Sequence, residues 1–166
     1  PDLSLTVEDG RALVATLHGR IGLKLAGSGH LRSGFAGELA AVAPALALGS
    51  CRAGRTTLFG RVSIDNLEPH FSGPLRVAGV DCAGITLAQG RAQLDLAVDR
   101  NLADADGNVS VALGAVAADG VTLAGLAGDG AFSWRDAALT ASYDLAARGL
   151  ALPLAQAASA TLEGRL

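Results

Sequence analysis

The titratable side chains of this sequence do not gather into a pattern that catalyses a reaction or binds a metal. His18, His30 and His70 each stand beside a glycine or a proline, and none lies at metal-ligand spacing from another histidine or a cysteine. This setting predicts solvated loop histidines. Asp95 and Asp99 would share one face of a strand about 13 Å apart, and acidic residues on the wet side of a strand are the ordinary case. We therefore expect no enzyme activity, no metal site and no cofactor.

Two glycine-containing segments begin like ligand-binding loops but lack the residues that complete one. Gly27-Ser28-Gly29-His30 begins like a phosphate loop, yet Arg32 stands where the next glycine belongs and no Gly-Lys-Ser/Thr follows. Residues 104–108 begin like a calcium loop without its downstream bidentate glutamate. We dismiss the first motif and interpret the second as a hairpin turn.

Cys51 and Cys82 are the only cysteines. In an oxidising compartment they can form a disulfide that closes a loop of about 30 residues and contributes roughly 3–4 kcal/mol. They can equally be two buried free thiols, because cysteine packs as a small hydrophobic side chain. Both interpretations stay open at this point.

Composition and charge argue against nucleic-acid binding and against a segment that spans a bilayer. The net charge is −3, the charges are scattered, and Lys24 is the only lysine, so no basic run could follow a phosphate backbone and nucleic-acid binding is disfavoured. No stretch of about 18 apolar residues could span a bilayer. The apolar content is carried by 34 alanines and 27 leucines, with four phenylalanines, one tryptophan and one tyrosine. A core rich in alanine is thin, because each alanine buries little area.

Alternation of apolar and polar residues is the dominant pattern. It is found in five segments, which are residues 2–8, 93–99, 108–113, 131–135 and 139–145. A pleated strand places every second side chain on one face, whereas a helix would spread Leu and Asp around its circumference. Asp-Gly pairs, which suit tight hairpin turns, stand between alternating runs. The alternation therefore predicts short antiparallel strands, each apolar on one face.

We expect an all-β fold in which an antiparallel meander forms a curved open sheet or groove; the alternative is a β-sandwich or a closed barrel. Residues 35–47 and 151–160 are rich in alanine but contain glycine or proline, which limits each to at most one or two short helical turns. The chain is expected to be a single β domain over residues 1–166 and a fragment of a longer protein.

One-faced strands leave a continuous apolar surface that a second sheet, barrel closure or an apolar ligand must cover. Small aliphatic side chains suit a smooth groove for acyl chains, and they suit an ordinary packed core equally well. The residues expected to line such a groove are the alternating apolar ones of the clearest strands: Leu94, Leu96, Val98, Val109, Val111, Leu113, Phe132, Trp134, Tyr143 and Leu145.

Three segments carry a family resemblance. Residues 84–96, 71–77 and 134–139 resemble strands of the AsmA-like superfamily, and within it the chain is most similar to the YdbH and TamB type of bridge-like lipid transfer protein in the Gram-negative envelope. The resemblance rests on the strand pattern over most of the chain. It implies a β-groove, anchored in the inner membrane by parts outside this chain, that crosses the periplasm and shields phospholipid acyl chains. The family has no catalytic residues to carry over.

The expected function is therefore that of a segment of a periplasmic intermembrane phospholipid transport protein. Its partner would be a phospholipid or another acyl-chain ligand, and it would reach the membrane through parts not in this chain. The alternative is a non-catalytic structural or adhesive β-domain of an envelope or surface protein. The two differ in what covers the apolar face, which is an acyl chain in the first and a closed protein core in the second.

Overall fold

The computed structural model describes residues 2–9, 16–30, 32–101, 103–136 and 138–165. These residues form strands and turns and contain no helix. The strands are β1 (Asp2–Val7), β2 (Leu17–His18), β3 (Ile21–His30), β4 (Gly34–Ala43), β5 (Leu46–Leu48), β6 (Cys51–Ala53), β7 (Thr56–Asp65), β8 (Glu68–Cys82), β9 (Ile85–Val98), β10 (Ala105–Leu113), β11 (Val116–Ala118), β12 (Val121–Leu123), β13 (Gly125–Arg135), β14 (Ala138–Leu152) and β15 (Ala155–Arg165).

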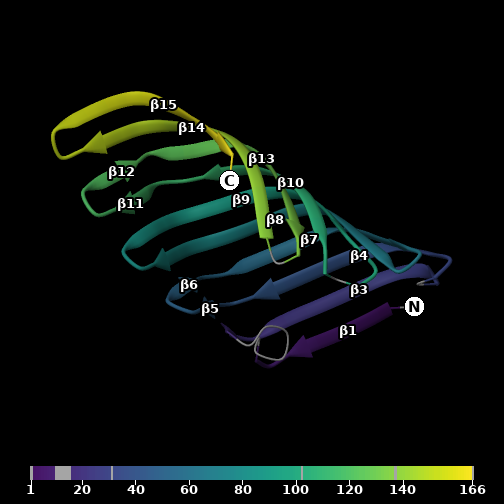
Figure 1. Cartoon of the computed structure of the whole chain (residues 1–166). Helices are drawn as coiled ribbons and strands as arrows, with labels where there is room; N and C mark the ends of the chain where they lie inside the picture. Colours follow the sequence, from purple (N-terminus) through teal and green to yellow (C-terminus); the bar gives the residue numbers. More distant parts are fainter. Residues whose placement is uncertain (1, 10–15, 31, 102, 137, 166) are drawn as a thin grey trace.

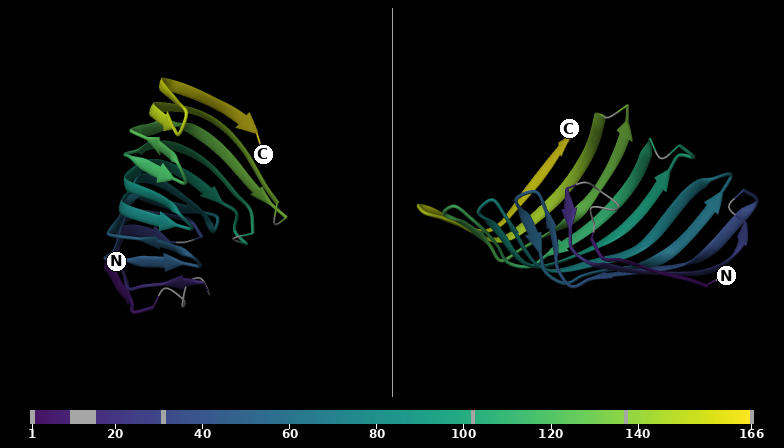
Figure 2. Two further views of the ribbon diagram at one scale, coloured as in Figure 1. Left: turned by 90° about the vertical axis from the view of Figure 1, so that its left-hand side faces the viewer. Right: turned by 90° about the horizontal axis from the view of Figure 1, so that it is seen from below.

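The strands form one antiparallel sheet. Its main path runs β1-β3-β4-β7-β8-β9-β10-β13-β14, with β15 paired to β14 at the far edge. Within the described residues β1 pairs only with β3 and β15 only with β14, so the sheet is open. Figures 1 and 2 show it as a single curved layer. The predicted meander and curved open sheet are confirmed, and the sheet is neither a sandwich nor a closed barrel.

The short strands continue the long ones beyond a bend. The hairpin β5–β6 lies between β2 and β8, and the hairpin β11–β12 lies between β9 and β14. We call the bend line the crease; it passes through residues 44–45, 54–55, 79, 88–89, 114–115, 124 and 149. Backbone hydrogen bonds join neighbouring strands along the crease, for example from Gly54 N to Gly79 O at 2.8 Å and from Gly114 N to Gln89 O at 2.8 Å, and β8, β9 and β14 run through it unbroken. The crease therefore bends the sheet without dividing it.

The apolar alternation slips by one residue where each long strand crosses the crease. On β8, Leu75 and Val77 precede the crease and Val80 follows it. Gly79 has φ 72°, in the left-handed region that favours glycine. The register of β8 against β9 is the same on both sides of the crease, with Ala78 opposite Gln89 and Val80 opposite Leu87, so the two strands slip together without a β-bulge. A Cβ at Gly90 would contact Val77 on one side of the crease and Leu87 on the other, so the apolar side chains remain on one face.

Both alanine-rich segments are strands. Residues 35–47 belong to β4 and β5, and residues 151–160 belong to β14 and β15. Pro44 stands at the crease and Pro153 in the turn between β14 and β15, where no ladder hydrogen bond is required of them. Pairing with neighbouring strands overrides the helix propensity of alanine, and neither segment forms a helical turn.

The sheet has little enclosed core. Among the described residues, the buried apolar side chains are Val7, Ile21, Phe35 and Ala43, and no large side chain is fully buried. Val7, Ile21 and Ala43 form one small cluster near the β1 edge. No helix of the described residues is long and apolar enough to cross a membrane.

Candidate functional site

All ten residues predicted to line a groove lie on one face of β9, β10, β13 and β14. Strand register forms one row across the four strands. In this row Leu94 lies opposite Val109, Val109 opposite Gly130, and Gly130 opposite Tyr143. A second row contains Leu96 and Phe132 on either side of Gly107. The other members occupy the parallel rows: Val98, Val111, Leu113, Trp134 and Leu145. We call this face, with its continuation over the other strands, the inner face.

The inner face extends well beyond the predicted residues, onto strands for which the sequence predicted no groove residues. Leu58 lies opposite Leu75, and Val62 lies opposite Phe71 in the β7–β8 pair. Leu25 lies opposite Leu39 in the β3–β4 pair. The same alternation marks these strands, but alanine and glycine occupy many of their apolar positions and weaken the signal. The apolar surface thus spans the sheet from β3 to β14 and continues onto the edge strand β15.

The solvent exposure of alanine residues allows the two faces to be compared, because the side chain is the same at every position. Ala92 and Ala141 on the inner face are half-buried. Ala112 and Ala131 on the opposite, polar face are exposed. No second layer covers either face in the described residues, so neighbouring side chains of the same curved sheet cause this difference. The inner face is partly sheltered by its own neighbouring side chains and remains open to solvent, with Trp134 40% exposed.

Aromatic rings lie along the inner face over glycines of adjoining strands. A Cβ at Gly60 would stand 2.7 Å from the ring of Phe71, and one at Gly107 would stand 2.5 Å from the ring of Phe132. Phe35 covers Gly27 in the same way, at 2.7 Å from the position of its Cβ. Large rings therefore lie flat in spaces left by missing side chains. This arrangement leaves the inner face low in relief.

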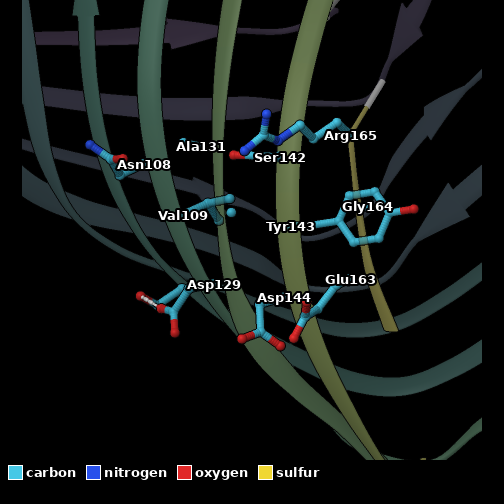
Figure 3. A pocket seen from close by; sticks show the side chains of 12 residues that line it. Asn108, Val109, Asp129, Ala131, Ser142, Tyr143, Asp144, Glu163, Gly164 and Arg165 are labelled. Carbon is cyan, nitrogen blue, oxygen red and sulfur yellow. Dashed lines mark hydrogen bonds between the residues drawn. The ribbon is translucent and has the colours of Figure 1, made fainter. Parts of the chain in front are cut away.

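The polar face carries a row of carboxylates at its C-terminal end. Asp129, Asp144 and Glu163 lie directly opposite one another on β13, β14 and β15. They line a hollow of ≈ 800 Å³ (Figure 3), in which the Ser110 hydroxyl donates a hydrogen bond to Asp129. The described residues contain no group of three or more His, Cys, Asp or Glu side chains arranged to hold a metal ion.

Asp95 and Asp99, which the sequence places on one strand face, have separate partners. Asp95 Oδ1 lies 3.0 Å from His70 Nε2 on the exposed polar face. Asp99 accepts hydrogen bonds from the backbone N–H groups of Ala103 and Asp104, and these bonds, that of Asp104 foremost, lower the pKa of its carboxyl group. Asp99 therefore fastens the β9–β10 turn and does not form a site with Asp95.

The prediction that the histidines lie in loops was wrong, because all three lie in strands. His70 lies within β8, and His18 and His30 lie in β2 and β3. A glycine or proline beside each histidine favours a turn, which is why the sequence predicts loops there. Pro69, however, sits beside the first residue of β8, a strand position that proline tolerates.

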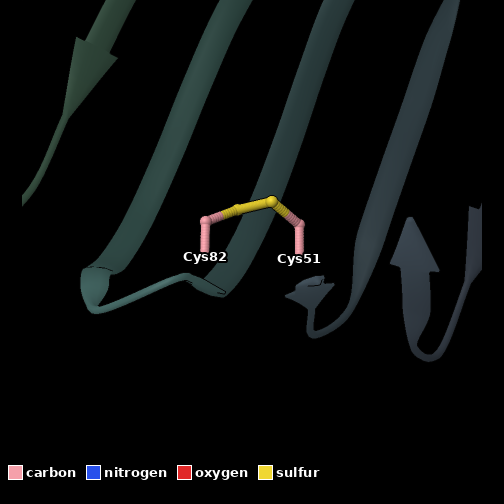
Figure 4. Close-up of a disulfide and its surroundings, with 2 residues drawn as sticks. All are labelled: Cys51 and Cys82. Carbon is pink, nitrogen blue, oxygen red and sulfur yellow. A yellow bond between two sulfur atoms is a disulfide. The ribbon is translucent and has the colours of Figure 1, made fainter. Parts of the chain in front are cut away.

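Cys51 and Cys82 form a disulfide (Figure 4). They lie directly opposite each other in the β6–β8 pair, beside the hairpin turns that end β5 and β8. Of the two states that the sequence left open, the described structure contains the bonded one. The bond joins β6 to β8 on the far side of the crease from the ten predicted groove residues.

Comparison of the chain with protein-family models, with curated proteins and with solved structures gave no match.

Proposed function

We propose that this chain is a segment of a periplasmic intermembrane phospholipid transport protein of the AsmA-like kind, and that its inner face shields acyl chains. One observation carries the proposal: an apolar face spans the main path of the sheet, and no protein layer of the described residues covers it. Anchoring in the inner membrane would come from parts outside this chain.

The energetics of the open face support a flexible apolar ligand. Covering apolar surface is worth about 25 cal/mol per Å², and each buried methylene contributes about 0.8 kcal/mol. Rings that lie flat over glycines, such as Phe71 over Gly60, leave a low surface along which an acyl chain can slide without meeting tall side chains. A ligand held by many small, similar contacts binds without a fixed position, as transport requires.

Two further features agree with this proposal. Disulfides persist in oxidising compartments such as the bacterial periplasm, and Cys51 and Cys82 form one. The polar face carries charged and polar side chains such as Asp95 and Asp129, so the sheet presents one wetted and one apolar side. We propose a non-catalytic role for the chain.

Mass spectrometry of gently extracted protein tests the proposal, with Val111→Asp as the disrupting variant. Val111 lies on the inner face, and its neighbour Ala112 is exposed on the polar face. We expect phospholipid to co-purify with the wild-type chain and with Ala112→Asp, and to be lost from Val111→Asp while its circular dichroism stays that of a folded sheet.

Two results would contradict the proposal. One is a lipid-free wild-type protein whose thermal unfolding is unaffected by detergent, which is the behaviour of a structural or adhesive β-domain. The other is wholesale unfolding of Val111→Asp, because that would place Val111 in an ordinary packed core. Val109→Asp, in the next row of the same strand, repeats the test at a second position.

A further inference from the structure

Four arginines surround one hollow on the polar face, beside the crease. The hollow measures ≈ 660 Å³, and Arg55, Arg76, Arg91 and Arg148 line it together with neutral residues that include Gln89. Arg76 comes from β8, Arg91 from β9 and Arg148 from β14, while Arg55 stands between β6 and β7. Among the described residues, no carboxylate lines this hollow. We call these four residues the arginine cluster.

The arginine cluster has no counter-charge within the described chain. Elsewhere Arg20 pairs with Glu8 at 2.7 Å, and Arg135 pairs with Asp106 and lies 3.7 Å from Asp104. None of the four clustered guanidinium groups has a carboxylate within ion-pair distance among the described residues. The contrast is notable in a chain whose net charge is −3. The acidic side chains that could neutralise the cluster are placed elsewhere.

Two members of the cluster face each other directly. Arg76 and Arg91 occupy opposite positions of the β8–β9 pair. Like charges at such positions destabilise a sheet. Thr57 on one side of this pair and Ala112 on the other add no negative charge. The arrangement therefore costs stability in the free chain, and an anion bound between the two guanidinium groups would remove that cost.

We infer that the arginine cluster binds phosphate groups. The planar guanidinium fork donates two parallel hydrogen bonds to phosphate oxygens and is only weakly hydrated, so several forks around one hollow favour phosphate. Four cations, three of them on separate strands, exceed what one monovalent carboxylate would balance, and the hollow is large enough for a substituted phosphate. The phosphate belongs either to a lipid headgroup or to a soluble phosphate compound. The site lies on the polar face and does not depend on acyl chains occupying the inner face.

Titration calorimetry at low ionic strength tests the site with inorganic pyrophosphate as the probe. Flotation with phosphatidylcholine vesicles, with and without phosphatidic acid, forms the second arm. The disrupting variant is Arg76→Gln/Arg91→Gln, and the matched control is Arg52→Gln/Arg61→Gln, which removes two exposed arginines outside the hollow. We expect the disrupting variant to bind about tenfold more weakly or worse, the control to bind like wild type, and added salt to weaken binding.

The two arms separate the sources of phosphate. Binding of pyrophosphate in solution supports a soluble phosphate compound, and binding confined to phosphatidic acid vesicles supports a lipid headgroup. The inference is overturned if neither probe binds or if the control variant loses as much affinity as the disrupting one. It is also overturned if low salt produces dimers that the disrupting variant abolishes, because the partner would then be the acidic row of a second copy. Arg55→Gln, outside the directly opposed pair, repeats the measurement at a single position.

Discussion

The ring of Tyr143 on β14 lies across Gly164 of the edge strand β15, in the space that a side chain at residue 164 would fill. A Cβ at Gly164 would stand 3.0 Å from Cε1 of the ring and closer still to its hydroxyl. Figure 3 shows the ring directed toward Gly164. Covering a strand glycine with an aromatic ring restores packing that glycine itself does not provide. The pair therefore fastens an otherwise open edge of the sheet.

The Tyr143–Gly164 relationship predicts that Gly164→Ala is destabilising. The added methyl group displaces the ring, and overpacking of this kind costs about 1–3 kcal/mol. Urea denaturation measures the loss. Gly22→Ala is the control, because a Cβ at Gly22 meets nothing closer than 3.8 Å. In a double-mutant cycle, Tyr143→Ala should remove most of the cost of Gly164→Ala; fully additive effects would contradict the contact.

The disulfide is predicted to stabilise the chain by about 3–4 kcal/mol, because it closes a loop of 31 residues and restricts the unfolded state. Guanidinium denaturation with and without dithiothreitol measures this difference. The Cys51→Ser/Cys82→Ser variant should match the reduced wild type and should not respond to dithiothreitol. Equal midpoints for oxidised and reduced wild type would show that the bond adds no stability.

Asp99 is predicted to make stability depend on pH in the acid range. The pKa of Asp99 is lower in the folded state than its ordinary value of about 3.9. At pH values between these two pKa values the unfolded chain therefore binds more protons than the folded chain. The contribution of Asp99 is present above the ordinary pKa and is lost as the pH falls through the folded one. Thermal melts should therefore show a smaller loss on acidification for Asp99→Asn than for wild type, after a lower starting value at pH 7. Asp65→Asn, at another hairpin turn, is the comparison.

Arg91→Gln is predicted to raise stability in dilute buffer, because it removes a like charge placed directly opposite Arg76. Cross-strand pair energies suggest a gain of about 0.2–1 kcal/mol. The gain should shrink at high salt, where the repulsion is screened. Denaturation curves at two ionic strengths measure it. A loss of stability at both would mean that the Arg91 stem packs favourably and outweighs the repulsion.

The fold class and the C-terminal half of the inner face could be predicted from sequence because the signal is local. Segments such as 93–99 and 139–145 alternate over a full strand, and each alternation specifies which side chains share a face. Antiparallel pairing of successive segments then brings Leu94, Val109 and Tyr143 into one row without further information. The N-terminal half of the face was missed because alanine and glycine occupy many of its apolar positions.

The crease and the arginine cluster could not be predicted in the same way. The sequence does contain a signal of the crease, because the apolar alternation shifts by one residue between Val77 and Val80 and at the corresponding places on other strands. Each shift alone, however, looks like the end of a strand. Arg76 and Arg91 are 15 positions apart and belong to different segments. Only the register of β8 against β9 places them opposite each other. Arg148 joins them through the arrangement of the whole sheet, which no local pattern contains.

The meander also determines how such a sheet can be assembled. Its main pairs, such as β7–β8, β8–β9 and β14–β15, join strands that follow each other along the chain. Contacts between sequence neighbours keep the contact order low for an all-β protein, and low contact order is associated with fast folding. Each new hairpin can add to an edge already formed, so the sheet can grow strand by strand as the chain emerges from a ribosome or a translocation pore. The open edge that allows this growth also has unpaired backbone N–H and C=O groups at every stage, and these could pair with another chain. Rapid formation of the next hairpin covers this edge and so limits such pairing.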